Sequence, residues 1–325
     1  MFNFAVFQVK ERQEGEVRVL QLRQERFLEL NISSSNSSHS SNHSADQTIW
    51  PIPISVINSF NPFSPTHQAL VTNREVELRI TGEIWEGEWV KLNPEFANFY
   101  RVHYSEEMLA RFAVSVEEKL LSPMDRLNLV DDLFAFIRSG HVSTEVGLRF
   151  LWSYEQEDNP NVWAVIVSAM GQLDTLISGV ENGGGSGGNN QSTSGNGQLQ
   201  EQYRKYGQLL LGKAYHRLGW YPPEVGRPSV GQKMRVDEVA QGKLRENVLC
   251  LMGRLKGENF TAVAGEKFAD YIEGKSDLSL GLLECVFRAF SAFSLSSRLN
   301  QTTDFQRLFQ VSCKLEVEVS VCEKW

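Results

Sequence analysis

Long apolar runs are missing from this sequence. The stretch 164–170 is far shorter than the roughly 20 apolar residues that a helix needs to cross a bilayer. The first residues, MFNFAVFQVKERQ, have no basic start, reach Lys10 before an apolar segment of sufficient length, and offer no small-residue cleavage site. They therefore do not resemble a secretion signal. We expect no membrane segment and a cytoplasmic location.

A surplus of basic residues is missing as well. Lysine and arginine number 32 against 40 acidic residues, which gives a formal net charge of −8. Such a chain has no excess positive charge to neutralise phosphates, so we expect no nucleic-acid partner. The hydrophobic share of 41% and the charged share of 22% are ordinary for a globular protein, and 325 residues suit about two domains.

Closely spaced cysteines are also missing. The four cysteines form no C-x-x-C pair and stand at Cys250, Cys285, Cys313 and Cys322. Without an export signal we expect them to be reduced thiols, two of them filling the core on helices, rather than disulfides or zinc ligands.

What the sequence does contain is a change of hydrophobic period. In its first part, apolar residues recur at every second position, as in Val76, Leu78 and Ile80, which is typical of a strand with one solvent-exposed face. Six or seven such strands predict a small β-sandwich. Prolines in the strand expected over 50–56 favour an edge position for it. The expected strands are 5–10, 17–23, one beginning at 26–28, 50–56, 75–80, 84–92 and 99–104.

From Ser105 onward the period is helical. Residues suited to helix N-caps stand at Ser105, Ser122, Ser143 and Asn159, two of them followed by proline. Short loops between amphipathic helices predict antiparallel pairs stacked into a HEAT- or armadillo-like superhelix. Further helices are expected over 203–218, 237–255, 260–273 and 280–293, before an atypical tail, 305–325, in which 314–321 alternates like a strand.

Two low-complexity segments interrupt these patterns. Residues 33–46 are rich in serine and asparagine and residues 179–199 in glycine, so both bury too little apolar area to fold. We expect both to be disordered insertions. The glycine run 183–188 lacks the Lys-Ser/Thr pair of a phosphate-binding loop, which favours an insertion over a nucleotide site.

The border between the two periods carries a distinctive block. It reads Trp89-Val90-Lys91-Leu92-Asn93-Pro94, followed by Phe99-Tyr100-Arg101-Val102 and Tyr104. The block resembles the pattern W-x-K-x-N…G-[FY]-Y-R-V-x-Y, which begins the C-terminal helical domain of the zinc aminopeptidases of the puromycin-sensitive, aminopeptidase N and ER-aminopeptidase group. This chain has Asn98 where that family has glycine. We expect Asn98 to adopt the left-handed backbone conformation.

Three further segments resemble that family in the same order. They are Trp50 with Ile52-Pro53-Ile54, Asp125-Arg126 with Leu129 and Asp132, and Leu218-Gly219-Trp220 with Leu244-Arg245. The resemblance implies a β-sandwich domain over 1–93 and an ERAP1-like C-terminal α-helical domain over 94–325. It also implies the C-terminal half of an enzyme that removes N-terminal residues from peptides with one zinc ion. In that family the helical domain caps the active-site cavity, limits peptide size and contacts peptides, and the catalytic domain lies in the same chain.

The catalytic signature of that family is missing from this sequence. A zinc aminopeptidase needs His-Glu-x-x-His on a helix and a G-x-M-E-N motif, and neither occurs here. His39 and His43 are four apart, but the segment HSSNH has no glutamate and lies in low-complexity sequence, so this spacing is adventitious. The remaining histidines, which belong to no nucleophile motif, are His67, His103, His141 and His216.

We therefore predict no catalytic, cofactor-binding or metal-binding residue and no peptide hydrolysis by this chain alone. Zinc is expected only in the intact family enzyme. The alternative function is that of a non-enzymatic protein whose helical superhelix binds peptides or a partner protein on its concave surface.

Two groups of residues suggest a site but favour a structural role. Asp125-Arg126 and Asp131-Asp132 resemble an acid–base cluster, yet we expect Arg126 and the helix N-terminus to keep the carboxylates ionised as a structural ion pair. The aromatic set Trp152, Tyr154 and Trp163 is expected to pack in the core between helices.

Overall fold

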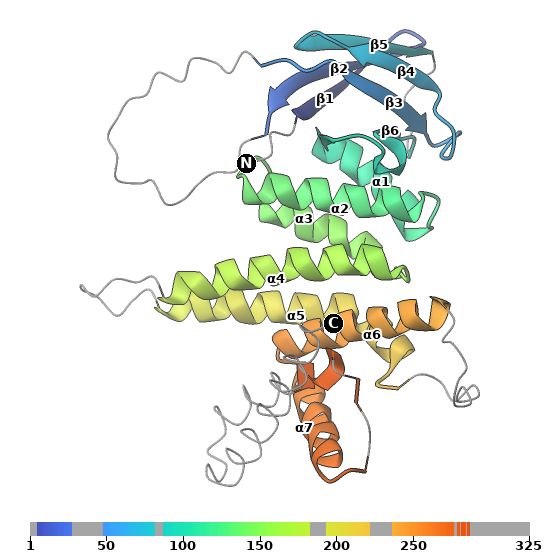
Figure 1. Ribbon diagram of the computed structural model, residues 1–325. Helices are drawn as coiled ribbons and strands as arrows, with labels where there is room; N and C mark the ends of the chain where they lie inside the picture. Colours follow the sequence, from blue (N-terminus) through green and yellow to red (C-terminus); the bar gives the residue numbers. More distant parts are fainter. Residues whose placement is uncertain are drawn as a thin grey trace. The chain divides into compact units, whose positions relative to one another are not determined.

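The chain was analysed as a computed structural model, which describes residues 5–27, 48–81, 87–182, 193–221, 236–275, 278–279, 281–283 and 285–286. It divides into two compact units, Met1–Ala169 and Met170–Trp325. Strands come first and helices follow, as predicted (Figure 1). The domain ranges 1–93 and 94–325 and the superhelical stacking of the helices stay predictions.

The first sheet contains four strands in the order β5-β2-β1-β7. β1 and β2 form an antiparallel hairpin that turns at Gly15, whose φ of 62° favours glycine. β7 pairs with β1 in parallel. A new strand predicted to begin at 26–28 is wrong, because Arg26 still pairs with Ala5 and ends β2. The strands are β1 Ala5–Glu14, β2 Val17–Arg26, β5 Glu75–Thr81 and β7 Tyr100–His103.

The second sheet contains three strands in the order β4-β3-β6, namely β4 His67–Val71, β3 Ile52–Asn58 and β6 Val90–Leu92. The predicted edge position of β3 is wrong, since β3 is central. β6 pairs only with residues 56–58 of β3. The half of β3 that contains Pro53 therefore has β4 as its only partner strand in the described part of the chain, which is compatible with a missing N–H.

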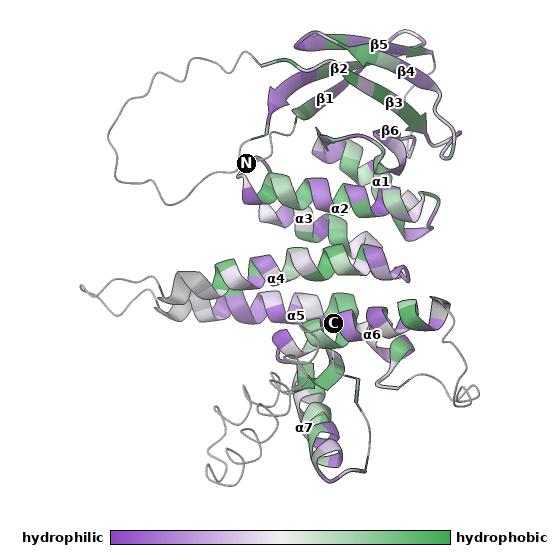
Figure 2. Cartoon of the chain, viewed as in Figure 1, coloured by the Kyte–Doolittle hydropathy of each residue, from purple (hydrophilic) through white to green (hydrophobic). Residues whose placement is uncertain are grey.

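The helices of the first unit begin where the caps predict. Ser105, Ser122 and Ser143 each accept a hydrogen bond from a backbone N–H in the first turn of α1, α2 and α3. α2 is buried on most sides, and Figure 2 shows hydrophilic segments between apolar ones along it. The bounds are η2 Pro94–Phe96, α1 Glu106–Glu117, α2 Pro123–Arg138, α3 Thr144–Leu151, η3 Trp152–Tyr154 and α4 Pro160–Asn182.

The aromatic set predicted for the core is split. Tyr154 and Trp163 are fully buried, whereas Trp152 is 44% exposed. The prediction is therefore wrong for Trp152, which lies at the start of η3, directly after the end of α3.

The second unit contains the end of α4, followed by α5 Thr193–Leu218, α6 Val236–Arg254 and α7 Glu258–Ile272. The predicted disordered insertion 179–199 is wrong at both ends, because residues 179–182 continue α4 and 193–199 begin α5. Packing extends the helices: Gln200 donates to the Ser178 hydroxyl, and the Tyr203 hydroxyl donates to the Met170 carbonyl.

Several predicted segments fall partly or wholly outside the described residues. Of the helix predicted over 280–293, residues 281–283 and 285–286 are helical. The insertion 33–46, the glycine run 183–188 and the tail 305–325 lie outside the described residues. In the described part of the chain, no helix is long and apolar enough to cross a membrane.

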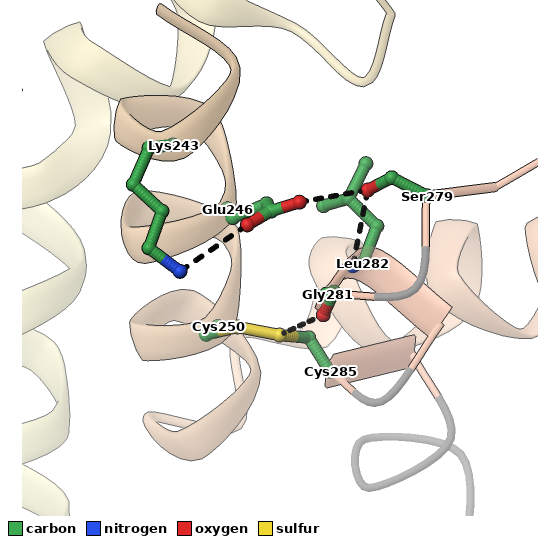
Figure 3. The surroundings of a disulfide bond; sticks show 7 residues. All are labelled: Lys243, Glu246, Cys250, Ser279, Gly281, Leu282 and Cys285. Atoms are coloured by element: carbon green, nitrogen blue, oxygen red, sulfur yellow. Dashed lines mark hydrogen bonds and ion pairs between the residues drawn. A yellow bond between two sulfur atoms is a disulfide. The ribbon is translucent and has the colours of Figure 1, made fainter. Parts of the chain in front are cut away.

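The prediction that all four cysteines are reduced thiols is wrong for one pair. Cys250 on α6 forms a disulfide with Cys285, and their Cα atoms are 4.8 Å apart (Figure 3). Because 35 positions separate the two, only folding brings them together. Cys313 and Cys322 lie outside the described residues.

Candidate functional site

The block that begins at Trp89 builds a cluster of buried charges between β6, β7 and α2. We call it the junction cluster, and its members are Lys91, Asn93, Arg101, Asp125, Asn128 and Asp132. All lie in the first unit.

Lys91 is the centre of the junction cluster. Its ammonium group lies 2.9 Å from the Asp125 carboxylate, 3.0 Å from the Asn128 side-chain oxygen and 3.1 Å from the carbonyl oxygens of Leu92 and Asn93. Lysine and aspartate are both fully buried. Because a buried ammonium is costly unless its protons are all bonded, these acceptors are what allow a charge in this place.

Asn93 shapes the backbone that follows Lys91. Its φ of 55° is left-handed, and its side chain donates to the carbonyls of Asn98 and Tyr100 and accepts from the Asn98 N–H. The left-handed conformation predicted for Asn98 is wrong, because Asn98 has no positive φ. Asn93 has that conformation instead, which asparagine adopts more readily than most residues.

Arg101 and Asp132 join β7 to α2. The guanidinium lies 2.8 Å from Asp132 and 2.6 Å from Asp131. Asp132 also accepts from the Val102 N–H and from the Asn128 amide. Burial raises the pKa of Asp132 to about 6, while Arg101 and the Val102 N–H act in the opposite direction. The carboxylate is therefore ionised at neutral pH.

The sequence suggested that Arg126 pairs with Asp125, but its ion-pair partner is a different carboxylate. Arg126 forms a two-bond ion pair with Glu157, at 2.7 Å and 2.9 Å, and donates to the Leu121 carbonyl. Glu157 in turn accepts from two backbone N–H groups just before α4. The prediction of a structural role is supported by these contacts, but the predicted partner is wrong, because Glu157 lies 31 positions away and no local pattern points to it.

In the second unit, the two segments Leu218-Gly219-Trp220 and Leu244-Arg245, which together resemble the family, are in contact. The Arg245 side chain donates at 3.1 Å to the carbonyl of Leu218, the last residue of α5, and Gly219 follows with a φ of 57°. Trp220 then stacks on Phe260, with ring centroids 5.0 Å apart. The arginine therefore supplies a donor to the carbonyl at the C-terminus of α5.

The histidines that the structure describes belong to no group of three possible metal ligands. His103 stacks on Phe136 with ring centroids 4.8 Å apart, and burial together with His141 lowers the pKa of His103. His141 pairs with the Ser139 hydroxyl. His67 pairs with Thr66, His216 contacts Tyr215, and the pair His39 and His43 lies outside the described residues.

The chemistry available to these groups is limited. Among the residues that the structure describes, no three histidine, cysteine, aspartate or glutamate side chains are placed to hold a metal ion. The pockets beside His103 have volumes of about 10 and 20 Å³, which is room for one or two water molecules and not for a peptide residue. What the contacts of the junction cluster do show is a link from β6 and β7 to α2.

Comparison with known families shows where this chain belongs. The family model of the ERAP1-like C-terminal domain matches residues 89–311. The chain belongs to this family. The match begins at Trp89, the first residue of the block from which the resemblance was read, so that resemblance is confirmed. An ERAP1-like C-terminal domain thus contains the junction cluster and the contact between Arg245 and Leu218.

Individual relatives of this ERAP1-like domain are aminopeptidases. The chain is 32% identical over 170 residues to the puromycin-sensitive aminopeptidase of Caenorhabditis elegans, covering 52% of this chain and 17% of the relative. It is 24% identical over 267 residues to the alanine/arginine aminopeptidase of Saccharomyces cerevisiae, covering 82% and 26%. Aminopeptidase M1-A of Oryza sativa matches at 28% over 136 residues, covering 41% and 15%. The chain thus spans about a quarter or less of the length of these relatives.

Proposed function

We propose that this chain is the C-terminal part of an aminopeptidase that removes N-terminal residues from peptides. Within it, the ERAP1-like domain covers the active-site cavity and limits which peptides enter. The observation that carries the proposal is the family match over 89–311, together with the similarity to the nematode and yeast aminopeptidases. Peptides and a catalytic domain are its proposed partners, and the cytoplasm its proposed location.

Zinc has no proposed ligand in this chain. The resemblance implies a zinc enzyme, but the sequence has no His-Glu-x-x-His, and the described residues offer no group of three ligands. The donor set does not fit the metal, so no catalytic step is assigned to these residues. The metal centre would belong to the part of the enzyme that this chain does not match.

Exposed aromatic side chains support docking onto a further domain. Phe60 and Phe63, in the connection between β3 and β4, are 73% and 76% exposed, and Phe99 is 89% exposed. Phe99 stands where the family pattern has phenylalanine or tyrosine, although at that exposure it adds little to the packing of this chain. An aromatic residue retained in such a position suits a contact with another surface.

The proposal is tested by reconstitution. The purified chain is mixed with the upstream portion of the nematode relative, ending where the match to this chain begins. We expect no hydrolysis by the chain alone, with or without zinc, and formation of a complex in sedimentation experiments. In the complex, long peptides should be cleaved more slowly relative to dipeptide-sized substrates than by the upstream portion alone.

Substitutions locate the contact. Phe60→Ser, Phe63→Ser and Phe99→Ser should each weaken the complex, whereas Leu209→Ser, at a residue of α5 that is 66% exposed, serves as the matched control. Zinc-dependent hydrolysis by the chain alone would contradict the assignment of roles. Binding of peptides by the chain without any association with the upstream portion would favour the non-enzymatic binding module instead.

A further inference from the structure

In the second unit, the disulfide closes a covalent loop of the chain that contains α7. Cys250 lies on α6, and Cys285 lies in the helical segment after α7, so the bond ties that segment to α6 (Figure 3). Cys285 is 7% exposed, whereas Cys250 is half-buried. Cys250 is therefore the more exposed residue of the pair.

The helical segment after α7 is also held against the protein by contacts that do not depend on the disulfide. Its apolar residues Leu282, Leu283 and Val286 are buried. The Ser279 hydroxyl donates to the Glu246 carboxylate of α6 at 2.9 Å, and the backbone N–H of Leu282 donates to Ser279. Gly281 lies so close that a Cβ there would stand 2.5 Å from Glu246. Breaking the disulfide would therefore loosen the segment without releasing it.

The reduced form has a partner already in place. The Cys285 sulfur lies 3.0 Å from the Gly281 carbonyl oxygen, one helical turn earlier. A thiol at this position can donate its S–H to that carbonyl, whereas a disulfide sulfur has no proton to donate. In the oxidised state the Cys285 sulfur is bonded to Cys250, and in the reduced state it would have the Gly281 carbonyl as a hydrogen-bond acceptor. Such an arrangement suits a disulfide that can open and close.

We propose that Cys250 and Cys285 form a reversible thiol–disulfide clip that couples the redox state of the surroundings to the rigidity of α6, α7 and the segment 281–286. The inference goes beyond the proposed function and does not depend on it. In a reducing compartment the clip would be open, and in an oxidising one it would be closed.

The exchange uses a low-molecular-weight thiol and its disulfide, of the glutathione class. In reduction, an incoming thiolate attacks the sulfur of Cys250, the more exposed residue of the pair, the Cys250–Cys285 bond breaks, and Cys285 leaves as a thiolate that takes up a proton. A second thiolate then attacks the mixed disulfide, releases Cys250 as a thiol and forms the low-molecular-weight disulfide. Two electrons pass from two thiols to the protein disulfide, and oxidation is the reverse.

The test uses the full chain with Cys313→Ser and Cys322→Ser, so that only this pair remains. The protein is equilibrated in glutathione buffers of graded ratio, quenched with acid, alkylated and mapped by mass spectrometry. We expect a reversible conversion from two alkylated cysteines to one linked peptide pair. The oxidised form should unfold about 10 °C higher and exchange amide hydrogens over 236–275 at least tenfold more slowly.

Controls make each outcome decisive. A further variant with Cys250→Ser and Cys285→Ser should unfold at the temperature of the reduced form at every glutathione ratio. If that variant does not fold, the hydrogen exchange of the unsubstituted pair in its two states still decides. Absence of the linked peptide at all ratios, a bond that no ratio reduces, or equal exchange in both states would each overturn the proposal.

Discussion

Replacing Lys91 by methionine tests whether the junction cluster stabilises the first unit. Methionine keeps most of the length and the apolar stem of lysine but removes the ammonium group. Asp125 then loses its ion-pair partner and Asn128 one donor, both in a fully buried position. Among the described residues, the Glu95 N–H and the Ser122 hydroxyl still donate to Asp125.

The expected cost follows from this geometry. Removing one partner of a buried ion pair typically costs about 3–5 kcal/mol, because the other charge stays buried without compensation. For a unit of this size, 1 kcal/mol corresponds to about 2–4 °C, so we expect the unfolding temperature of the first unit to fall by roughly 10 °C. Urea unfolding followed by tryptophan fluorescence reports on this region, because Trp89 is buried and bonded to Ser115.

A double-mutant cycle separates the pair from its surroundings. Lys91→Met, Asp125→Asn and the double variant are compared with Arg149→Met, which removes one partner of an exposed ion pair on α3. The exposed pair should cost less than about 1 kcal/mol. The double variant should cost clearly less than the sum of the two single ones. Additive losses, or a Lys91 variant as stable as the Arg149 variant, would refute the reasoning.

Three further changes have expected outcomes. The pKa of Asp132 is raised to about 6 in the folded protein, above its value in the unfolded chain, so its contribution to stability is full below about pH 4 and is lost as the pH rises through 6. Urea unfolding of the protein and of its Asp132→Asn variant should therefore differ by about 2 kcal/mol more in favour of the unsubstituted protein at pH 4 than at pH 7.5, and a constant difference would disprove this. Arg126→Lys should lower stability by about 2 kcal/mol, because lysine cannot form the two-bond pair with Glu157, and Arg126→Met should cost more; equal stability of all three proteins would contradict it. Gly147→Ala places a Cβ 2.2 Å from the Ile137 side chain and should cost about 1–3 kcal/mol, whereas Gly212→Ala, which meets no neighbour in helix α5, should add about 0.5–1 kcal/mol; thermal unfolding that ranks the two in the reverse order would count against the packing of α3 on α2.

Local signals were sufficient for most of the elements. Three serine caps and Asn159 placed the starts of four helices, because a cap needs only a side-chain oxygen and the next few N–H groups. Alternating apolar and polar residues predicted β1, β2 and β5 for a similar reason. The alternation lies within each strand and can be recognised without knowing the partner strand. Strand β4 was not predicted, because its five residues, HQALV, show no alternation of apolar and polar residues.

What the sequence determined by itself is therefore the order of strands and helices, the caps that start the helices, and the family block that begins at Trp89. Tertiary structure alone decided that Lys91 meets Asp125, that Arg126 meets Glu157, that β3 is central, and that Cys250 meets Cys285. The physical reason is the range of the interactions. Caps and periodicity act over a few residues, whereas buried charges and thiols find their partners only when packing brings positions about 30 residues apart into contact.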